Sequence, residues 1–231
     1  GELLNVTEQG DLGELGLGDV LVGAGHRHHA IRLVHLRQSA ATRPHPVVRP
    51  LHAGLAHELL HNDPRFAALF RAFAKPLADY LDFLKVDRGR LALHFTRSWG
   101  TVSRRGDSTQ AHGHLQSHLS LVYYLQKPPG SSGIAFLDKE APNQFAPNLF
   151  APAMVQAGLV QEVTQFNTQK VYLEPQQDEV LIFPSKVLHE IPTNQAEGVR
   201  VSIACDIVAT VDDSARLEYL LPRPESWKRV G

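Results

Sequence analysis

The sequence predicts a mainly β fold with N-terminal helices, in which a jelly-roll core follows a helical layer. From Arg90 onward, short alternating apolar and polar runs are separated by turn residues, a pattern typical of β-sandwiches and barrels. Before that point, apolar residues recur at helical spacing. We therefore expect a single domain over residues 1–231, with an N-terminal strand and helical layer (1–89), a core (90–210) and a C-terminal tail (211–231).

The composition argues against several classes of protein. The chain has 23 basic and 24 acidic residues, so its charge indicates neither a nucleic-acid partner nor a membrane surface. No apolar run approaches the roughly 20 residues of a membrane-spanning helix. The single cysteine, Cys205, excludes an internal disulfide and favours a reducing compartment, so we expect a cytoplasmic protein. The anomaly is the number of histidines, which is 13.

The first ninety residues are expected to supply one or two strands and a helical segment. Alternation is weak at Asp19–Val22 and clear at Ala30–Arg37. Residues 51–86 carry apolar side chains at helical spacing, and Asp63-Pro64 is a favourable start because aspartate caps a helix and proline fits its first turn. Pro76 should kink or divide this helix.

The core is expected to consist of short strands. These are predicted at 91–99, in the run that ends at Leu125, and at 133–138, 170–173, 179–183, 189–192 and 199–208. Residues 139–170 form an unusually long connection, which predicts a lid, a binding loop or an insertion. Arg104 and Arg105 precede the histidine-rich stretch and could bind an anionic substrate, although solvated loop arginines explain them equally well.

One short motif resembles a zinc peptidase helix. His57-Glu58-Leu59-Leu60-His61 matches H-E-x-x-H, in which two histidines bind zinc and the glutamate activates water. Leu51, Leu55 and Leu59 would mark the apolar face of such a helix, and both histidines would then point away from it. We therefore favour solvent-facing histidines here.

A second group of histidines predicts a metal site. His112, His114 and His118 lie within seven residues, directly before an apolar run, and His189 lies in a later strand. Imidazole suits iron, zinc, copper and nickel, and side chains two residues apart on a strand share one face. A single histidine is seldom a ligand, but three that adjoin a buried strand favour a metal site.

The motifs around these histidines resemble a known superfamily. In order, they are H-x-H, SLVYYL, a glycine before an apolar strand, EPQQDEVLIFPSKVLHEIP and R-x-S. Together they resemble the 2-oxoglutarate/Fe(II)-dependent oxygenases, and most closely a bacterial and phage group of that superfamily. The likeness covers roughly residues 90–210 and implies a core of the double-stranded β-helix type.

The resemblance assigns roles by position. His112 matches the first ligand of the family's H-x-D/E motif, and His189 matches the distal ligand histidine. Arg200 and Ser202 match the pair that holds the far carboxylate of 2-oxoglutarate, for which arginine is suited because its guanidinium binds carboxylates bidentately. Tyr124 is expected on the same side, since alternation lets only one of the two adjacent tyrosines point inward.

His114 departs from the family pattern, which has a carboxylate at this position. Either His114 is a ligand, which we favour, or another group or water fills the place, with His118 as the reserve candidate. The resemblance implies Fe(II), 2-oxoglutarate and O2 as cofactor and cosubstrates, with ascorbate as a stimulant. The expected activity is hydroxylation of a small-molecule or peptide substrate, with no catalytic residue beyond the metal site.

Two alternatives use the same histidines. H-x-H-x3-H also resembles the first cupin motif, and a cupin would use His112, His114, His118 and His189 as ligands without 2-oxoglutarate. That interpretation gives Arg200 no function, so we favour the oxygenase. The second alternative is a barrel that binds metal without catalysis, which would need no clamp for a carboxylate.

Overall fold

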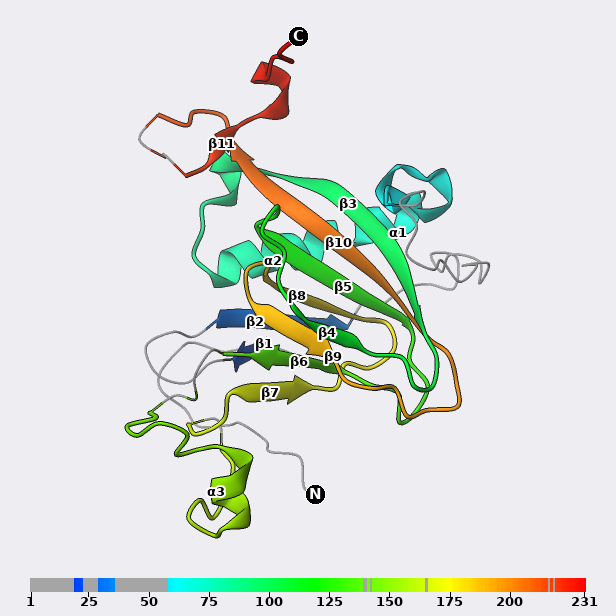
Figure 1. The fold of residues 1–231 in the computed structure, drawn as a ribbon. Helices are drawn as coiled ribbons and strands as arrows, with labels where there is room; N and C mark the ends of the chain where they lie inside the picture. Colours follow the sequence, from blue (N-terminus) through cyan, green and yellow to red (C-terminus); the bar gives the residue numbers. More distant parts are fainter. Residues whose placement is uncertain are drawn as a thin grey trace.

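The computed structural model describes residues 19–22, 29–35, 58–138, 141, 143–164, 166–215, 217 and 219–231. Two β-sheets pack face to face, and helices cover the outer side of the larger sheet (Figure 1). No helix among these residues is both long and apolar enough to cross a membrane.

The larger sheet has seven strands. Its order is β1-β2-β8-β5-β10-β11, and β3 also pairs with β10. All pairs are antiparallel except β10 with β11. The strands are β1 (Asp19–Val22), β2 (His29–His35), β3 (Leu91–Ser103), β5 (Leu119–Gln126), β8 (Glu179–Pro184), β10 (Arg200–Val211) and β11 (Leu221–Pro222).

The smaller sheet has the order β4-β9-β6-β7 and is entirely antiparallel. Its strands are β4 (Thr109–His112), β6 (Ile134–Leu137), β7 (Lys170–Leu173) and β9 (Leu188–Ile191). From β3 to β10 the chain alternates between the sheets, except that β6 and β7 are consecutive in the smaller one. The resulting orders, β3-β10-β5-β8 and β4-β9-β6-β7, are those of an eight-stranded jelly roll. The predicted fold class is therefore confirmed.

Within the described residues, the helical layer is divided into shorter and less regular helices than the sequence predicted. Short 3-10 helices span Leu60–Asn62 and Pro64–Phe66, and regular helices follow as α1 (Ala67–Ala72) and α2 (Ala74–Phe83). Residues 51–57 lie outside the described part of the chain. The carboxylate of Asp63 accepts from the backbone N–H of Arg65, so it caps the first turn as expected.

The helix is divided, but the break comes before Pro76 rather than at it. Phe73 separates α1 from α2. Pro76 has no N–H to donate to the carbonyl of Ala72, four residues earlier, and its ring crowds that carbonyl. The interruption therefore falls one turn ahead of the proline.

Two apolar clusters fill the two interfaces. The outer one lies between the helices and the larger sheet and includes Phe73, Tyr123 and Ile203. The inner one lies between the sheets and includes Tyr124, Phe136 and Phe183. Adjacent tyrosines of β5 thus point to opposite sides, and in β10 the residues at 200, 202, 204 and 206 face inward because Ile203, Cys205 and Ile207 face the helices.

The long connection between β6 and β7 contains one short helix, α3 (Pro152–Gln156). Figure 1 shows α3 and its flanking segments projecting beyond β7, at the edge of the smaller sheet. Two of its aromatic and aliphatic side chains are strongly exposed, Phe145 at 86% and Leu159 at 64%. At the other end of the chain, the tail docks on β10 through β11 and ends with a 3-10 helix at Pro224–Ser226.

Candidate metal centre

Three histidines from separate parts of the chain converge between the sheets. His112 ends β4 and lies directly opposite His189 of β9 in the strand register, with ring centroids 4.4 Å apart. His114 follows in the next loop, and its ring centroid lies 5.2 Å from that of His112 and 5.4 Å from that of His189. One possible ligand atom from each ring lies within 4.8 Å of the other two.

The hydrogen bonds of these rings determine which nitrogen is free. Nδ1 of His112 lies 2.8 Å from the carbonyl oxygen of Gln110, and Nδ1 of His189 lies 2.9 Å from that of Val187. A carbonyl can only accept, so each Nδ1 carries the proton and each Nε2 keeps its lone pair. This tautomer is the one that binds a metal through Nε2.

Burial keeps His189 neutral. Its side chain is 5% exposed, and burial is the main cause that lowers its pKa to about 4, against the opposing hydrogen bond to Val187. The nearby rings of His112 and His114 lower the pKa further. A neutral imidazole is the form that binds a metal ion, so His189 needs to lose no proton for this at neutral pH.

A buried carboxylate lies directly behind His114. Oδ1 of Asp206 is 2.8 Å from Nδ1 of His114, and the Asp206 side chain is fully buried. Burial alone would raise the pKa of Asp206, but hydrogen bonds from His114, Gln116 and Ser117 outweigh it and lower this pKa. Asp206 is therefore a carboxylate at neutral pH, and Nδ1 of His114 donates to it. No motif in the sequence marks Asp206, although a lone aspartate inside the apolar run of β10 is a signal.

His118 lies apart from this cluster. Its backbone N–H donates to the carbonyl of Ile207, and its Nδ1 accepts from the backbone N–H of Ala209 at 3.0 Å. The side chain thus fastens the start of β5 to β10, and the residue as a whole is exposed. Among the described residues, the group that could hold a metal comprises His112, His114 and His189 without His118, so the four-histidine cupin set is not assembled.

Arg200 lies inside the fold without a counter-ion. It is 2% exposed, and its Nη1 donates to the carbonyls of Ser132 at 3.0 Å and Gly133 at 3.4 Å. Among the described residues no carboxylate forms an ion pair with it, and its Nε has no hydrogen-bond partner. Burial lowers the pKa of Arg200, an effect that Tyr124 and Glu174 oppose.

Two more buried polar atoms close to this arginine also lack hydrogen-bond partners in the described part of the chain. They are the hydroxyl oxygens of Tyr124 and Ser132. Ser202, 4% exposed, lies directly opposite Tyr124 in the pairing of β10 with β5. Burial is the main cause that raises the pKa of Tyr124, so its hydroxyl stays protonated and can donate. Buried polar groups are normally satisfied, so this set fits an anionic ligand that would complete it.

The H-E-x-x-H segment does not form a metal site in the part of the chain that is described. His57 lies outside the described residues, and Glu58 pairs with Arg97, with Nε 3.0 Å from Oε2. The expectation that His61 faces solvent was wrong, because its Nδ1 lies 2.7 Å from the hydroxyl of Ser98 and its ring packs near Phe70 and Phe95.

The cause of this error is the local structure. The spacing of the leucines predicted a regular helix with Leu59 on the buried face. Instead a 3-10 helix begins at Leu60, which is 8% exposed, while Leu59 is 55% exposed. The turn therefore rotates His61 toward the outer cluster.

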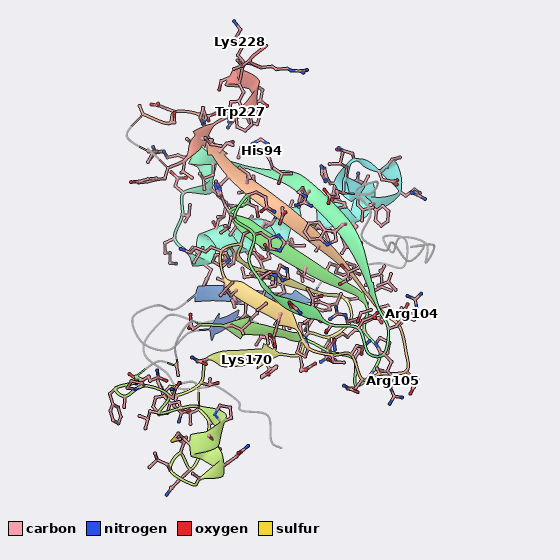
Figure 2. All side chains as sticks on the ribbon, in the orientation of Figure 1. His94, Arg104, Arg105, Lys170, Trp227 and Lys228 are labelled. Carbon is pink, nitrogen blue, oxygen red and sulfur yellow. The ribbon has the colours of Figure 1, made fainter. Side chains whose placement is uncertain are left out.

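Other candidates lie at the rim. Figure 2 shows Arg104 and Arg105 at the outer edge of the molecule, beyond one end of β3, and His94 near its other end. Arg105 forms an ion pair with the exposed Glu197, and His94 forms a hydrogen bond with Thr210 at 2.8 Å. The partners of Arg105 and His94, and the position of Arg104 at the rim, account for these side chains without a bound ligand.

Comparison with solved structures finds relatives of low identity. An oxidoreductase of the 2OG-Fe(II) oxygenase family from Burkholderia pseudomallei is 14% identical, with a TM-score of 0.39 over 64% of this chain and 54% of that chain. A Pseudomonas putida prolyl-4-hydroxylase is 15% identical, with a TM-score of 0.38 over 69% and 68%. HygX from Streptomyces hygroscopicus, with nickel and 2-oxoglutarate bound, is 14% identical, with a TM-score of 0.47 over 77% and 82%. The chain thus spans about half the length of the first of these.

Comparison with curated proteins gives no match. The family model described as "Putative 2OG-Fe(II) oxygenase" matches residues 97–206, a little under half of the chain. This segment contains all three converging histidines, Arg200 and Asp206. The part of the chain that builds the site therefore matches the 2OG-Fe(II) oxygenase family.

Proposed function

We propose that the protein hydroxylates a small-molecule or peptide substrate, using Fe(II), 2-oxoglutarate and O2. The observation that carries this proposal is the pairing of two features between the same sheets. One is a group of three imidazoles whose Nε2 lone pairs are free, and the other is a buried arginine without a counter-ion.

Iron would be held by His112, His114 and His189. Imidazole nitrogen is a suitable donor for Fe(II), and three protein ligands leave positions open for a cosubstrate and dioxygen. When bound, the metal supplies the redox chemistry by which O2 and 2-oxoglutarate give succinate, carbon dioxide and a hydroxylated product. The part played by the protein is to fix the three rings, which it does through a hydrogen bond to each Nδ1.

2-Oxoglutarate would be held at its far carboxylate by Arg200, Ser202 and Tyr124. A carboxylate has two oxygens that accept hydrogen bonds, and it would neutralise the guanidinium and accept from the phenol of Tyr124. The hydroxyl of Ser132 is a further donor that the sequence analysis did not name. Burying an unpaired charge is costly, so a dianionic ligand would offset an unfavourable feature of the free protein.

Exclusion of water would come from the inner cluster and from the connection between β6 and β7. We assign residues 139–170 the role of a lid because their exposed apolar side chains could cover a bound substrate. Ascorbate would act as a reductant that restores Fe(II) after unproductive turnover.

The test is production of succinate from 2-oxoglutarate by the full chain with Fe(II) and ascorbate. Ascorbate can reduce the iron when no substrate is oxidised, so succinate should form above a metal-free control. Arg200→Met should abolish it, and Arg105→Met, an arginine at the rim, should leave it unchanged. Metal binding without any succinate or 2-oxoglutarate binding would refute the proposal and favour a barrel that uses its metal alone.

A further inference from the structure

The three imidazoles differ in what their Nδ1 atoms contact. The partners of His112 and His189 are backbone carbonyls, which carry no charge. His114 alone contacts a carboxylate, that of Asp206 at 2.8 Å. His114 is also the residue that stands where the family pattern has a carboxylate ligand. His114 thus lacks the negative charge that the family has at this position, and its hydrogen-bond partner Asp206 carries one.

We propose that Asp206 is a positioning residue that returns this charge to the metal site from one hydrogen bond away, an inference that rests on the proposed iron site. Two histidines and one carboxylate leave a divalent ion with a net charge of one, whereas three neutral imidazoles leave it with two. With the negative charge of Asp206 included, the net charge is again one. A carboxylate that accepts from the remote nitrogen of a ligand histidine also raises the basicity of that ligand.

The surroundings of Asp206 leave its charge available to His114. Gln116 donates to Oδ2 at 2.9 Å and Ser117 donates to Oδ1 at 3.3 Å, and both are neutral. Among the described residues, Arg97 is the arginine or lysine that pairs with Asp206, with Nη1 3.8 Å from Oδ2. Arg97 is already paired with Glu58, through Nε and Nη2. The charges of Arg97 and Glu58 cancel, so the net charge of this group is that of Asp206.

Two contacts hold the ring of His114 and a third holds its backbone, which suits a fixed ligand. Asp206 holds Nδ1, and the indole of Trp99 stacks on the ring with centroids 5.8 Å apart and planes 16° apart. The backbone N–H of His114 donates to the carbonyl of Ser185 at 2.8 Å. Nε2 therefore points to one place, toward the rings of His112 and His189.

The first experiment compares metal affinity in the wild type, Asp206→Asn and Asp107→Asn, by titrating the metal-free full chain with Co(II) and following its visible absorption. Asparagine keeps the shape and an acceptor oxygen but removes the charge. Co(II) affinity should fall about 10-fold to 100-fold in Asp206→Asn. Asp107→Asn makes the same change in an exposed turn and should have no effect. Equal affinity in Asp206→Asn and the wild type would overturn the inference.

The second experiment separates charge from structural support by returning the charge at a different residue. His114→Asp places a carboxylate at the ligand position, so the double variant His114→Asp/Asp206→Asn keeps one negative charge at the site. Its Co(II) affinity should exceed that of Asp206→Asn, because the lost charge is restored. If Asp206 merely supports the fold, the double variant will bind as weakly as Asp206→Asn, and that result would overturn the inference. The double variant also keeps a pair of side chains that can hydrogen-bond at these positions, so its Co(II) affinity is compared with that of the wild type if Asp206→Asn alone does not fold.

The reduction potential of bound iron gives an independent readout. Removing a negative charge disfavours Fe(III) more than Fe(II), so the potential should rise in Asp206→Asn relative to the wild type. An unchanged potential would contradict the proposed role. If the wild type itself binds neither Co(II) nor Fe(II), the proposed function fails. If the wild type binds both and Asp206→Asn behaves identically, the inference alone fails.

Discussion

Replacing Arg200 by methionine separates the contribution of this residue to the affinity for 2-oxoglutarate from its contribution to the stability of the fold. A bound carboxylate would accept about two charge-assisted hydrogen bonds from the guanidinium, each contributing about 1.5–3 kcal/mol. Their loss should cost about 3–6 kcal/mol, and since about 1.4 kcal/mol corresponds to tenfold, the Kd for 2-oxoglutarate should rise at least about 100-fold. Methionine has a similar length and can fill the same space.

The fold should barely respond to this substitution. Arg200 makes one short hydrogen bond to a carbonyl, at 3.0 Å to Ser132, and a longer one at 3.4 Å to Gly133. Leaving these carbonyls without a donor costs about 1 kcal/mol, and removing a buried charge without a counter-ion offsets that cost. The free energy of unfolding of the ligand-free protein should therefore stay within about 1 kcal/mol of the wild type, or rise.

Two measurements test this, namely calorimetric titration of the metal-loaded protein with 2-oxoglutarate and urea unfolding of the ligand-free protein. Arg105→Met is the control, because Arg105 lies at the exposed rim (Figure 2). The reasoning is refuted if the affinity of Arg200→Met equals that of the wild type. It is also refuted if stability falls by several kcal/mol, because Arg200 would then be a structural residue.

Three further substitutions have distinct expected results. Tyr124→Phe should raise the Kd for 2-oxoglutarate about 3-fold to 10-fold without lowering stability in urea, because the hydroxyl has no hydrogen-bond partner among the described residues; a loss of stability would contradict this. Gly133→Ala should destabilise the protein by about 2–4 kcal/mol, since the new Cβ would collide with the backbone carbonyl oxygen of Leu173; an unchanged urea midpoint would contradict it. His61→Ala should leave metal content, measured by elemental analysis, unchanged and cost about 1 kcal/mol through the lost hydrogen bond with Ser98; loss of metal would revive the peptidase motif.

The sequence predicted the strands of the core better than the helices. Period-two alternation identified β3, β5, β8 and β10, because one side of each packs against an apolar cluster. Part of the predicted N-terminal helix, in the residues that the structure describes, forms 3-10 helices at Leu60–Asn62 and Pro64–Phe66 before α1 and α2. Propensity and spacing alone do not distinguish these two kinds of turn.

The site residues that belong to a sequence motif could be predicted. The residue that reaches the site only through tertiary contacts could not. His112 and His189 came from a family pattern, and their convergence follows from the pairing of β4 with β9. Asp206 belongs to no motif that was recognised. Its contact with His114 joins residues 92 positions apart and depends on the register of β10, which alternation does not specify.

The strand β10 carries both the residue that would bind the cosubstrate and the residue that supports a metal ligand. The register of this strand in the sheet is therefore critical for the proposed function. Arg200 opens the strand and Asp206 lies six residues further on the same side, so a slip by a single residue would turn both toward the helices together. Neighbouring strands on each side, β3 and β5, oppose such a slip over most of its length. Substitutions at the outward-facing positions of β10 should therefore be tolerated far more readily than insertions or deletions in this strand. An insertion or deletion between Arg200 and Asp206 would move the residue that binds the cosubstrate relative to the residue that supports the metal ligand.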